Sequence, residues 1–310
     1  MVQAGEAGLV APLINRNLSP FETGLGVPVM ESATGLGNGG VTVGWDLHWA
    51  SHSLREDDDS GELELDGETL RQDLRVLVGL SESITLVVDV PWIHHSAGSL
   101  DSLIDGWHDL WGMPEGARAE QPRDVLRFAL GGDEAFSLDR SASGLGDVEL
   151  GLAWRLWGDE RQAFGTFAQL TLDTGDVADL TGSGATAVAV GLRYAHHGCG
   201  LAALSCHLQA GIADPGDLSL AARQRSTLLF GGLSLAWRLG PELAAVAQLE
   251  ARESAYEEGP LGANDVAVWG GLGLRWQPED AWTLEAQFSE DLNVGSAPDI
   301  SFRLGVARRW

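Results

Sequence analysis

The 310-residue chain contains no lysine, so all 19 of its Lys and Arg residues are arginine. They stand against 45 aspartate and glutamate residues, which gives a formal net charge of −26 at pH 7. A polyanion of this kind repels phosphate, so we expect no nucleic-acid partner. The sequence also lacks any apolar run of about 18 residues, the length that a transmembrane helix requires. Membrane-spanning helices are therefore excluded.

The lack of long apolar runs does not exclude a membrane protein that crosses with strands. The hydrophobic fraction is 44% and the mean hydropathy is −0.02, both ordinary values for a folded chain. Strands of a membrane barrel expose only alternate residues to lipid, so their average hydropathy is unremarkable. Composition therefore leaves a β-barrel open.

The sequence is also poor in cysteine, and its first residues show no export signal. The two cysteines are Cys199 and Cys206. If both lie in one strand, the extended chain places them about 23 Å apart, too far for a disulfide. Cysteine therefore predicts nothing about the compartment. Residues 1–12 have neither the basic start nor the apolar centre of an export signal, and for an exported protein we expect that a signal was removed before Met1.

The last residues of the chain alternate between apolar side chains and polar or small ones. Ile300, Phe302, Leu304 and Val306 share one parity, and the chain ends on Trp310 in the same register. Because successive side chains of a strand point to opposite faces, this pattern predicts an amphipathic strand. The closing strand of an outer-membrane barrel would end on an aromatic residue in this way.

About twelve segments carry this alternation, an even number as in single-chain bacterial barrels. Their lengths of roughly 10 to 14 residues suit a tilted crossing of a bilayer, whereas the mode in globular proteins is about 5–6. The predicted strands are 41–54, 68–80, 84–95, 145–157, 163–173, 184–195, 200–212, 226–239, 242–253, 265–277, 281–291 and 300–310.

The links between these segments are short and long in turn. Strict alternation predicts short periplasmic turns at one end of a barrel and long extracellular loops at the other. The predicted fold is therefore all-β, a transmembrane antiparallel barrel of about 12 strands over residues 41–310, and a pair of soluble β-sandwiches is the alternative. The short links are 81–83, 158–162, 196–199, 240–241 and 278–280, and the long links are 55–67, 96–144, 174–183, 213–225, 254–264 and 292–299.

Each predicted strand has an apolar parity that would face lipid. Tryptophan recurs in it near the strand ends, as in the aromatic belts at membrane interfaces. A soluble core rich in tryptophan is the alternative interpretation. The tryptophans concerned are Trp45, Trp49, Trp92, Trp237, Trp276, Trp282 and Trp310.

The residues that alternate with the lipid-facing ones are predicted to point into the barrel. Arginine and carboxylate are both well represented there, so these residues either line water or form a paired network that fills the bore. Several other inward positions are alanine or glycine, which leave room for solvent, a substrate or a segment folded inside. The predicted lumen-lining residues are Arg75, Asp89, Glu149, Arg155, Arg193, Glu250, Arg275, Glu285 and Arg303.

Two segments outside the strands could occupy that room. Residues 1–40 are too rich in proline and glycine for a regular element, and we expect them in the periplasm or tucked into the lumen. Loop 96–144, the long extracellular loop, contains a helical repeat that begins after Ser99. A lid or plug is favoured over an interfacial helix, because the polar face is acidic. The apolar face of this repeat comprises Leu100, Leu103, Ile104, Trp107 and Trp111.

Three stretches carry a resemblance to a known family, namely residues 66–118, PLINRNLSPF at 12–21 and SGLGDVELGLAWRL at 143–156. The chain resembles a family of predicted Gram-negative outer-membrane β-barrels that carries only a domain-of-unknown-function label. The resemblance spans most of the chain, and the helical repeat in loop 96–144 is its most specific part. It implies a barrel in the outer membrane of a Gram-negative bacterium, and it brings no established activity or catalytic residues.

Acidic residues form one dense run between residues 56 and 68. A solvated loop is the simpler interpretation. A divalent-cation contact near lipopolysaccharide is the other, because clustered carboxylates suit hard cations. The expected partners are outer-membrane lipid and lipopolysaccharide, with divalent cations at acidic loop 56–68. The run comprises Asp57, Asp58, Asp59, Glu62, Glu64, Asp66 and Glu68.

The histidines predict neither a metal site nor an active site. His48 and His52 would lie about 13 Å apart along a strand, too far to chelate one metal. His94 and His95 are adjacent and point to opposite faces of a strand. We expect no metal and no cofactor. A lipid hydrolase would need a serine and a histidine exposed together near the bilayer, and the lipid-facing parity holds almost no such pair.

Three functions remain for a barrel of this kind. The leading one is a channel or transporter for small solutes that loop 96–144 narrows, the second is a closed structural or assembly barrel, and the third is a lipid-modifying enzyme. Continuous pairing of the inward arginines with carboxylates would favour the closed barrel, whereas an unpaired ladder of arginines would favour anion passage. A serine or aspartate within hydrogen-bond reach of His94 or His48 would favour the enzyme.

Overall fold

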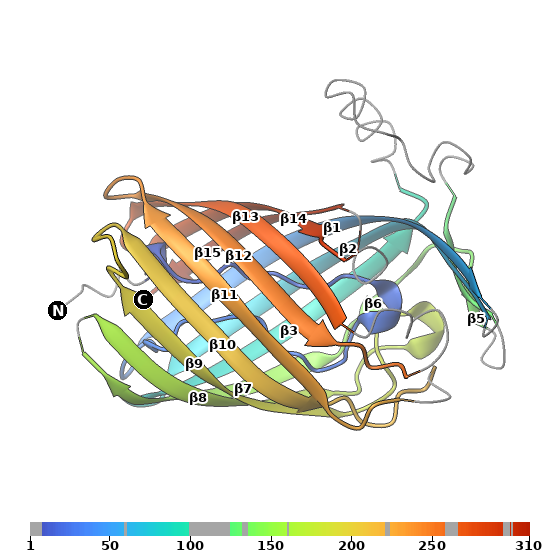
Figure 1. The fold of residues 1–310 in the computed structure, drawn as a ribbon, viewed down its shortest axis with the longest axis horizontal. Helices are drawn as coiled ribbons and strands as arrows, with labels where there is room; N and C mark the ends of the chain where they lie inside the picture. Colours follow the sequence, from blue (N-terminus) through green and yellow to red (C-terminus); the bar gives the residue numbers. More distant parts are fainter. Residues whose placement is uncertain are drawn as a thin grey trace, which may run out of the picture.

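The computed structural model describes residues 8–58, 61–98, 125–131, 136–159, 161–220, 224–257, 266–293, 298 and 300–310. Within these ranges, twelve antiparallel strands form a closed wall in which β1 pairs with both β2 and β15 (Figure 1). The predicted twelve-stranded barrel is confirmed. None of the described helices is long and apolar enough to cross a membrane. The wall strands are β1 (Val41–Asp58), β2 (Gly61–Gly79), β3 (Ile84–Ser96), β7 (Val148–Gly158), β8 (Gln162–Leu172), β9 (Ala187–His197), β10 (Leu204–Asp214), β11 (Leu228–Arg238), β12 (Leu243–Glu253), β13 (Val266–Glu279), β14 (Trp282–Asp291) and β15 (Ile300–Arg309); the short helices are η1 (Pro20–Glu22) and η3 (Val177–Asp179).

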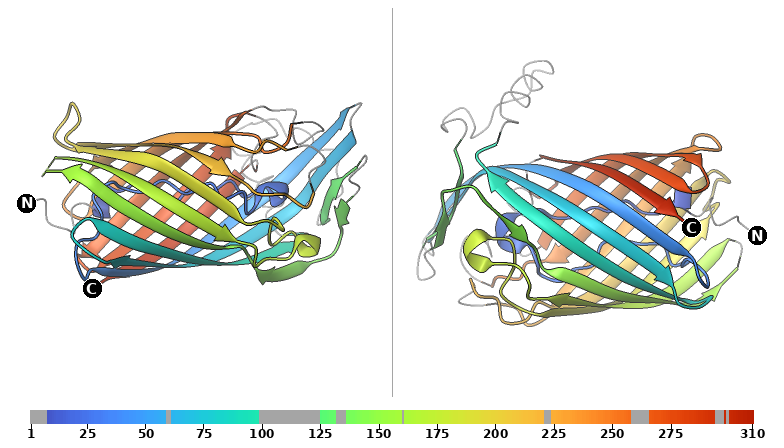
Figure 2. Two further views of the ribbon diagram at one scale, coloured as in Figure 1. Left: turned by 90° about the horizontal axis from the view of Figure 1, so that it is seen from below. Right: turned by 180° about the vertical axis from the view of Figure 1, so that it is seen from behind.

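Short and long links lie at opposite ends of the barrel (Figure 2). The turns after β2, β7, β9, β11 and β13 gather at one end, which we call the short-turn end. Trp310 also lies there, since its backbone carbonyl accepts from Val41 N, where β1 begins. The links after β3, β8, β10, β12 and β14 gather at the opposite, long-loop end. The predicted alternation of short and long links therefore holds, with one exception.

The exception is the hairpin of β1 and β2, which extends beyond the rest of the wall at the long-loop end (Figure 1). These strands have 18 and 19 residues and stay paired as far as Asp58 and Gly61. The prediction of a long loop at 55–67 is therefore wrong. Leu63 and Leu65 of the extension are buried in an apolar cluster with Phe128, so packing against protein sustains the strands beyond the barrel.

Loop 96–144 contains three short strands that the alternation did not reveal. β4 (Arg127–Leu130) pairs with β2, and β5 (Phe136–Leu138) pairs with β4, so both add to the extension of β1 and β2. β6 (Ala142–Leu145) pairs with β3. The predicted lid or plug residues lie outside the described residues, so their role stays a prediction. They are Leu100, Leu103, Ile104, Trp107 and Trp111.

The outer face of the wall is apolar, as the strand parity predicts, and Leu272 there is 63% exposed. Exposed tryptophans gather near the short-turn end, where an indole can bury its ring in lipid and keep its N–H near water. Trp49 of the predicted belt is half-buried, and its Nε1 donates to Glu68 Oε2 at 2.6 Å. The exposed tryptophans towards the short-turn end are Trp45, Trp154, Trp157, Trp237, Trp276, Trp282 and Trp310, whereas Trp92 is exposed towards the long-loop end of β3.

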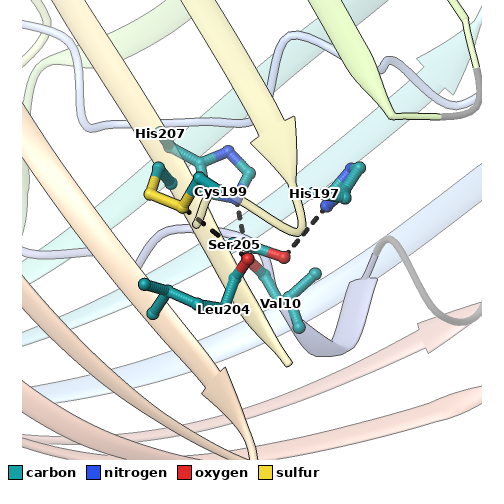
Figure 3. Close-up of a disulfide and its surroundings, with 7 residues drawn as sticks. Val10, His197, Cys199, Leu204, Ser205 and His207 are labelled. Atoms are coloured by element: carbon teal, nitrogen blue, oxygen red, sulfur yellow. Dashed lines mark hydrogen bonds between the residues drawn. A yellow bond between two sulfur atoms is a disulfide. The ribbon is translucent and has the colours of Figure 1, made fainter. Parts of the chain in front are cut away.

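Cys199 and Cys206 form a disulfide in which the two Cα atoms are 6.1 Å apart (Figure 3). The case considered from the sequence, with both cysteines in one strand, does not arise, because β10 begins at Leu204 rather than at residue 200 and Cys199 lies before it. The residues before Leu204 form a turn, and Cys199 N donates to Leu204 O at 3.0 Å. The turn folds the chain back and brings the two thiols together.

We expect this disulfide to be detectable by alkylation of the denatured protein. Without prior reduction, N-ethylmaleimide should add to neither cysteine, and after reduction it should add to both. Intact mass measures the difference directly. Two alkyl groups on the unreduced protein would contradict the disulfide. A Cys199→Ser variant serves as the control, because it should take up one alkyl group with or without reductant.

Candidate functional site: the bore and its inner hairpin

Residues 8–40 lie inside the barrel and fold back on themselves, and we call them the inner hairpin (Figures 1 and 2). The described chain starts at the short-turn end, reaches the long-loop end at η1, and returns to β1. Near the short turns, His207 Nε2 donates to Val10 O at 2.8 Å (Figure 3). Near the long loops, Tyr256 Oη donates to Phe21 O at 2.6 Å. The hairpin therefore runs the length of the bore twice.

Two glycines let the hairpin approach the wall closely where it reverses. Gly24 and Gly26 have φ values of 84° and 74°, in the left-handed region that favours glycine. A Cβ at Gly24 would lie 2.3 Å from Asp147 Oδ2, and one at Gly26 would lie 2.4 Å from Ala187 Cβ. A larger residue at either position would therefore force the hairpin away from the wall.

Apolar side chains of the hairpin fill gaps that small wall residues leave. Leu13 is fully buried, and a Cβ at Gly273 would lie only 2.7 Å from its Cδ2. Met30 lies opposite Gly232 in the same manner, with its Sδ 2.5 Å from where a Cβ would be. Burying side chains of this size stabilises a structure by roughly 1.5–3 kcal/mol each. The small inward residues of the wall therefore accommodate the hairpin.

Wall side chains also form hydrogen bonds with backbone N–H and C=O groups of the hairpin, which is not paired as a strand. Gln248 Oε1 accepts from Leu13 N at 2.9 Å, and its Nε2 donates to Leu13 O at 3.1 Å. Gln209 Nε2 donates to Pro28 O at 3.1 Å. Arg275 Nη2 donates to Pro12 O at 2.8 Å. Because buried backbone groups need partners, these side chains make an irregular segment tolerable inside the barrel.

The guanidinium of Arg16 in the hairpin lies among three carboxylates of the wall. Its Nη2 donates to Asp89 Oδ2 at 2.6 Å, and its Nη1 donates to Glu149 Oε1 at 2.8 Å. Its Nε lies 3.8 Å from Asp73 Oδ2. These carboxylates come from the adjacent strands β3, β7 and β2. We call Asp73, Asp89 and Glu149 the carboxylate pocket.

The carboxylate of Glu31 in the hairpin lies between two wall arginines. Arg193 Nη1 donates to Glu31 Oε2 at 2.5 Å, and Arg75 Nη2 donates to Oε1. We call Arg75 and Arg193 the arginine pair. Arg75 Nη1 also donates to Asp89 Oδ2 at 3.0 Å, so it joins the arginine pair to the carboxylate pocket.

Further ion pairs continue this network along the bore. Arg303 contacts Asp46 at 2.5 Å and also pairs with Glu285. Glu285 pairs in turn with Arg275. In the described part of the lumen, every arginine just named has a carboxylate partner, so the arginines form a paired network rather than an unpaired ladder.

Eight of the nine predicted lumen-lining residues are buried inside the barrel. Glu250 is one of them, and it accepts from Gln248 Nε2 at 2.9 Å. The ninth, Arg155, is half-buried at the short-turn rim, where it donates to Glu82 O at 2.8 Å. The eight buried residues are Arg75, Asp89, Glu149, Arg193, Glu250, Arg275, Glu285 and Arg303.

Three charges that the hairpin itself brings, Arg16, Glu22 and Glu31, are not among the predicted lumen-lining residues. Glu22 pairs with Arg252 of the wall. The available signal was weak: these are isolated charges in an otherwise apolar, proline- and glycine-rich segment. Parity cannot assign them to a face, because the segment has no regular period.

A cavity of about 260 Å³ remains beside the hairpin at the short-turn end. Glu31 of the hairpin lines it, together with Arg75, Asp46 and Arg303 of the wall. The hairpin therefore fills the bore incompletely, and one member of the arginine pair borders open space.

The acid–base candidates do not form a lipid-hydrolase site at the bilayer. His48 Nε2 lies 3.4 Å from Asp73 Oδ2, but both groups are buried in the bore beneath the hairpin. His95 Nε2 donates to Leu180 O at 3.0 Å, and its Nδ1 contacts Thr69 Oγ1 at 3.0 Å. Among the described residues, no group of three or more His, Cys, Asp or Glu side chains could hold a metal ion.

Residues 2–310 match a family described as a protein of unknown function, DUF3187. The chain belongs to this family. The match covers almost the whole sequence, which agrees with the resemblance seen in three stretches of it. No curated protein matches the chain.

Solved structures with the same fold are outer-membrane barrels. The DUF3187 chain resembles the COG4313 outer membrane channel from Pseudomonas putida F1, with a TM-score of 0.56 and 15% identity over 90% of this chain and 98% of that one. The NanC porin gives a TM-score of 0.48 and 9% identity over 86% and 98% of the two chains. The KdgM porin in complex with disordered oligogalacturonate gives 0.45 and 10% over the same shares. At 15% identity, the likeness to the COG4313 channel is one of fold.

Proposed function

We propose that this DUF3187 protein is an outer-membrane channel for small solutes, and that the inner hairpin closes its bore in the conformation described. The observation that carries the proposal is the charged bore. The wall directs arginines and carboxylates into the lumen, and a segment without strand pairing covers them. The long-loop end would face outward and the short-turn end the periplasm.

The buried charges argue for a lumen that meets water or polar solute. Replacing a buried ion pair with well-packed apolar side chains is often neutral or stabilising, because removing charges from water is costly. A permanently filled barrel would therefore gain little from a wall lined with Arg75, Arg193, Arg252, Arg275 and Arg303. A wall that becomes hydrated when the hairpin leaves needs such residues.

The attachment of the hairpin fits a movable plug. Between Gly8 and Leu36 it belongs to no strand, and its contacts with the wall are side-chain contacts. Moving it would break ion pairs and hydrogen bonds but would leave the twelve-stranded wall paired. Residues 8–40 thus supply the narrowing that we expected from loop 96–144, and that loop keeps a predicted role as an outer lid.

A closed barrel with a structural or assembly role is the second candidate. The continuous arginine–carboxylate network favours it, since no unpaired arginine ladder is found in the described lumen. The two candidates differ in whether the hairpin ever leaves the bore. An enzyme is disfavoured, because the contact of His48 with Asp73 in the bore is covered by the hairpin.

The acidic run at 56–68 keeps two interpretations. Three of its carboxylates have basic or N–H partners: Arg55 Nη2 donates to Glu62 Oε1 at 2.8 Å, Arg127 pairs with Glu64, and Trp49 Nε1 donates to Glu68 Oε2. Divalent cations and lipopolysaccharide at this run stay a prediction. It would be tested by equilibrium dialysis with Ca²⁺.

Single-channel recording in a planar bilayer tests the channel. We expect rare, brief openings from the intact protein. In Arg16→Gln, where the hairpin loses its main ion pairs, open time should rise about tenfold or more. Arg140→Gln is the matched control, because Arg140 pairs with Asp179 and is 62% exposed. Silence of both intact protein and Arg16→Gln, with heat-modifiable gel migration showing that each is folded, would favour the closed barrel.

A further inference from the structure

Each charge of the inner hairpin meets wall groups of opposite sign. Arg16 lies in the carboxylate pocket, Glu31 in the arginine pair, and Glu22 against Arg252. Carboxylates of β2, β3 and β7 thus surround the hairpin cation, with Arg71 and Arg75 of β2 as their wall partners. Arginines of β2 and β9 hold a hairpin carboxylate between them. The hairpin fits this wall as a ligand of complementary charge would.

The carboxylate pocket is built for a planar cation with several N–H donors. Two carboxylates accept from different nitrogens of the Arg16 guanidinium, at 2.6 and 2.8 Å, and the third lies 3.8 Å from Nε. The side chains of Asp73 and Asp89 are each 1% exposed. Guanidinium groups match such sites because their donors are fixed in one plane.

The hairpin does not saturate this pocket. Asp89 Oδ1 is buried and, among the described residues, has no hydrogen-bond partner, and the same holds for Arg16 Nε. A buried acceptor without a partner is costly. The pocket therefore has acceptor capacity that a better-fitting cation could use when the hairpin leaves.

The arginine pair is built for a carboxylate and lies next to the pocket. Both arginines donate to the two oxygens of Glu31, one to each. Asp89 Oδ2 accepts from Arg16 and from Arg75, so one wall carboxylate and one wall guanidinium separate the two hairpin charges. Three hydrogen bonds and the width of one guanidinium bound their separation at roughly 10 Å. Open space of about 260 Å³ borders Glu31 and Arg75.

We propose that the bore of this protein binds small zwitterions, with a guanidinium or ammonium group in the carboxylate pocket and a carboxylate at the arginine pair. The hairpin occupies both places as an internal substitute for the solute. The inference rests on the proposed channel and names its solute class: amino acids and short peptides that carry a basic group. Free L-arginine is the probe, since it carries both groups within the required span.

The test uses the full chain with both places vacated, as Arg16→Ala/Glu31→Ala, in a planar bilayer. We expect L-arginine to block its current in a concentration-dependent manner. Guanidinium chloride and sodium acetate carry only one of the two groups each. Each should therefore need a concentration at least about tenfold higher than L-arginine for the same block, because two linked groups bind together more tightly than either alone. A hairpin charge that is present competes with the solute for its place on the wall. The single variants should therefore be less sensitive to arginine than the double variant, and the intact protein should be the least sensitive.

Three results separate this inference from the channel itself. Conductance without arginine block in the double variant would overturn the solute class and leave the channel standing. If L-arginine still blocks the current after Asp89→Asn is added to the double variant, the assignment of the cation to the carboxylate pocket would be overturned. No conductance from any folded variant would overturn the channel. If the double variant does not fold, Arg16→Ala alone tests the carboxylate pocket by a second measurement. Guanidinium chloride at low concentration should raise its unfolding temperature, and sodium chloride at the same concentration should not; equal effects of the two salts would overturn the pocket.

Discussion

In the Arg16→Gln variant we expect the free energy of unfolding to fall by about 3–5 kcal/mol, the cost of breaking a buried ion pair by removing one partner. Arg16 touches all three members of the carboxylate pocket. Glutamine keeps most of the side-chain length and an N–H donor but leaves those carboxylates with less positive charge. Arg71 and Arg75 stay as the nearby cations.

Equilibrium unfolding of the detergent-solubilised protein by urea measures this change, with heat-modifiable gel migration to count the folded fraction. Arg140→Gln removes an exposed arginine and its ion pair, and it should change stability by only about 0–1 kcal/mol. Equal effects of the two substitutions would show that the Arg16 contacts do not stabilise the fold.

The size of the Arg16 effect also reports whether the hairpin can leave. If it stays in the bore, the orphaned carboxylates remain buried and the full cost appears in stability. If it leaves, water solvates the carboxylates, and the barrel retains more of its stability while conductance rises. A small loss of stability with a large gain in open time would therefore support a movable plug, and a large loss with silence would support a permanently filled barrel.

The wall of the barrel was predictable because lipid and lumen impose a strict period of two. Once one parity must be apolar and the other polar, strand number and inward residues follow from sequence, as for Arg193 and Glu285. The pattern fails beyond the membrane. At 55–67 the chain alternates Leu63 and Leu65 with acidic residues, and a protein cluster around Phe128, which cannot be foreseen from local sequence, makes it a strand.

The contents of the bore and the disulfide were harder to predict for a physical reason. Parity shows that Arg75 and Asp89 face inward, but their partners depend on which segment fills the lumen. Residues 8–40 have no period, so their course is set by shape and charge fit to the assembled wall. The disulfide likewise depends on a strand beginning at Leu204 instead of four residues earlier, which is within the ordinary uncertainty of an element boundary.

Asp89→Asn and Arg193→Gln change wall residues that stay in the bore when the hairpin leaves, so they should shift the ion selectivity of the channel in opposite directions. The first removes an anion from the carboxylate pocket, so the open bore should prefer anions more strongly. The second removes a cation from the arginine pair, so the bore should prefer cations. Because charged groups lining a pore set its selectivity, we expect the cation-to-anion permeability ratio to change by about threefold or more in each direction.

Reversal potentials in a salt gradient measure this ratio, with Arg140→Gln as the unshifted control. The opposite signs make the test independent of how far the hairpin opens, since a general loosening would move both variants the same way. Equal shifts in both variants would mean that the ions do not pass the carboxylate pocket and the arginine pair. Opposite shifts would place both groups on the conduction path and would show that the charges now paired inside the barrel face a solute when the hairpin leaves.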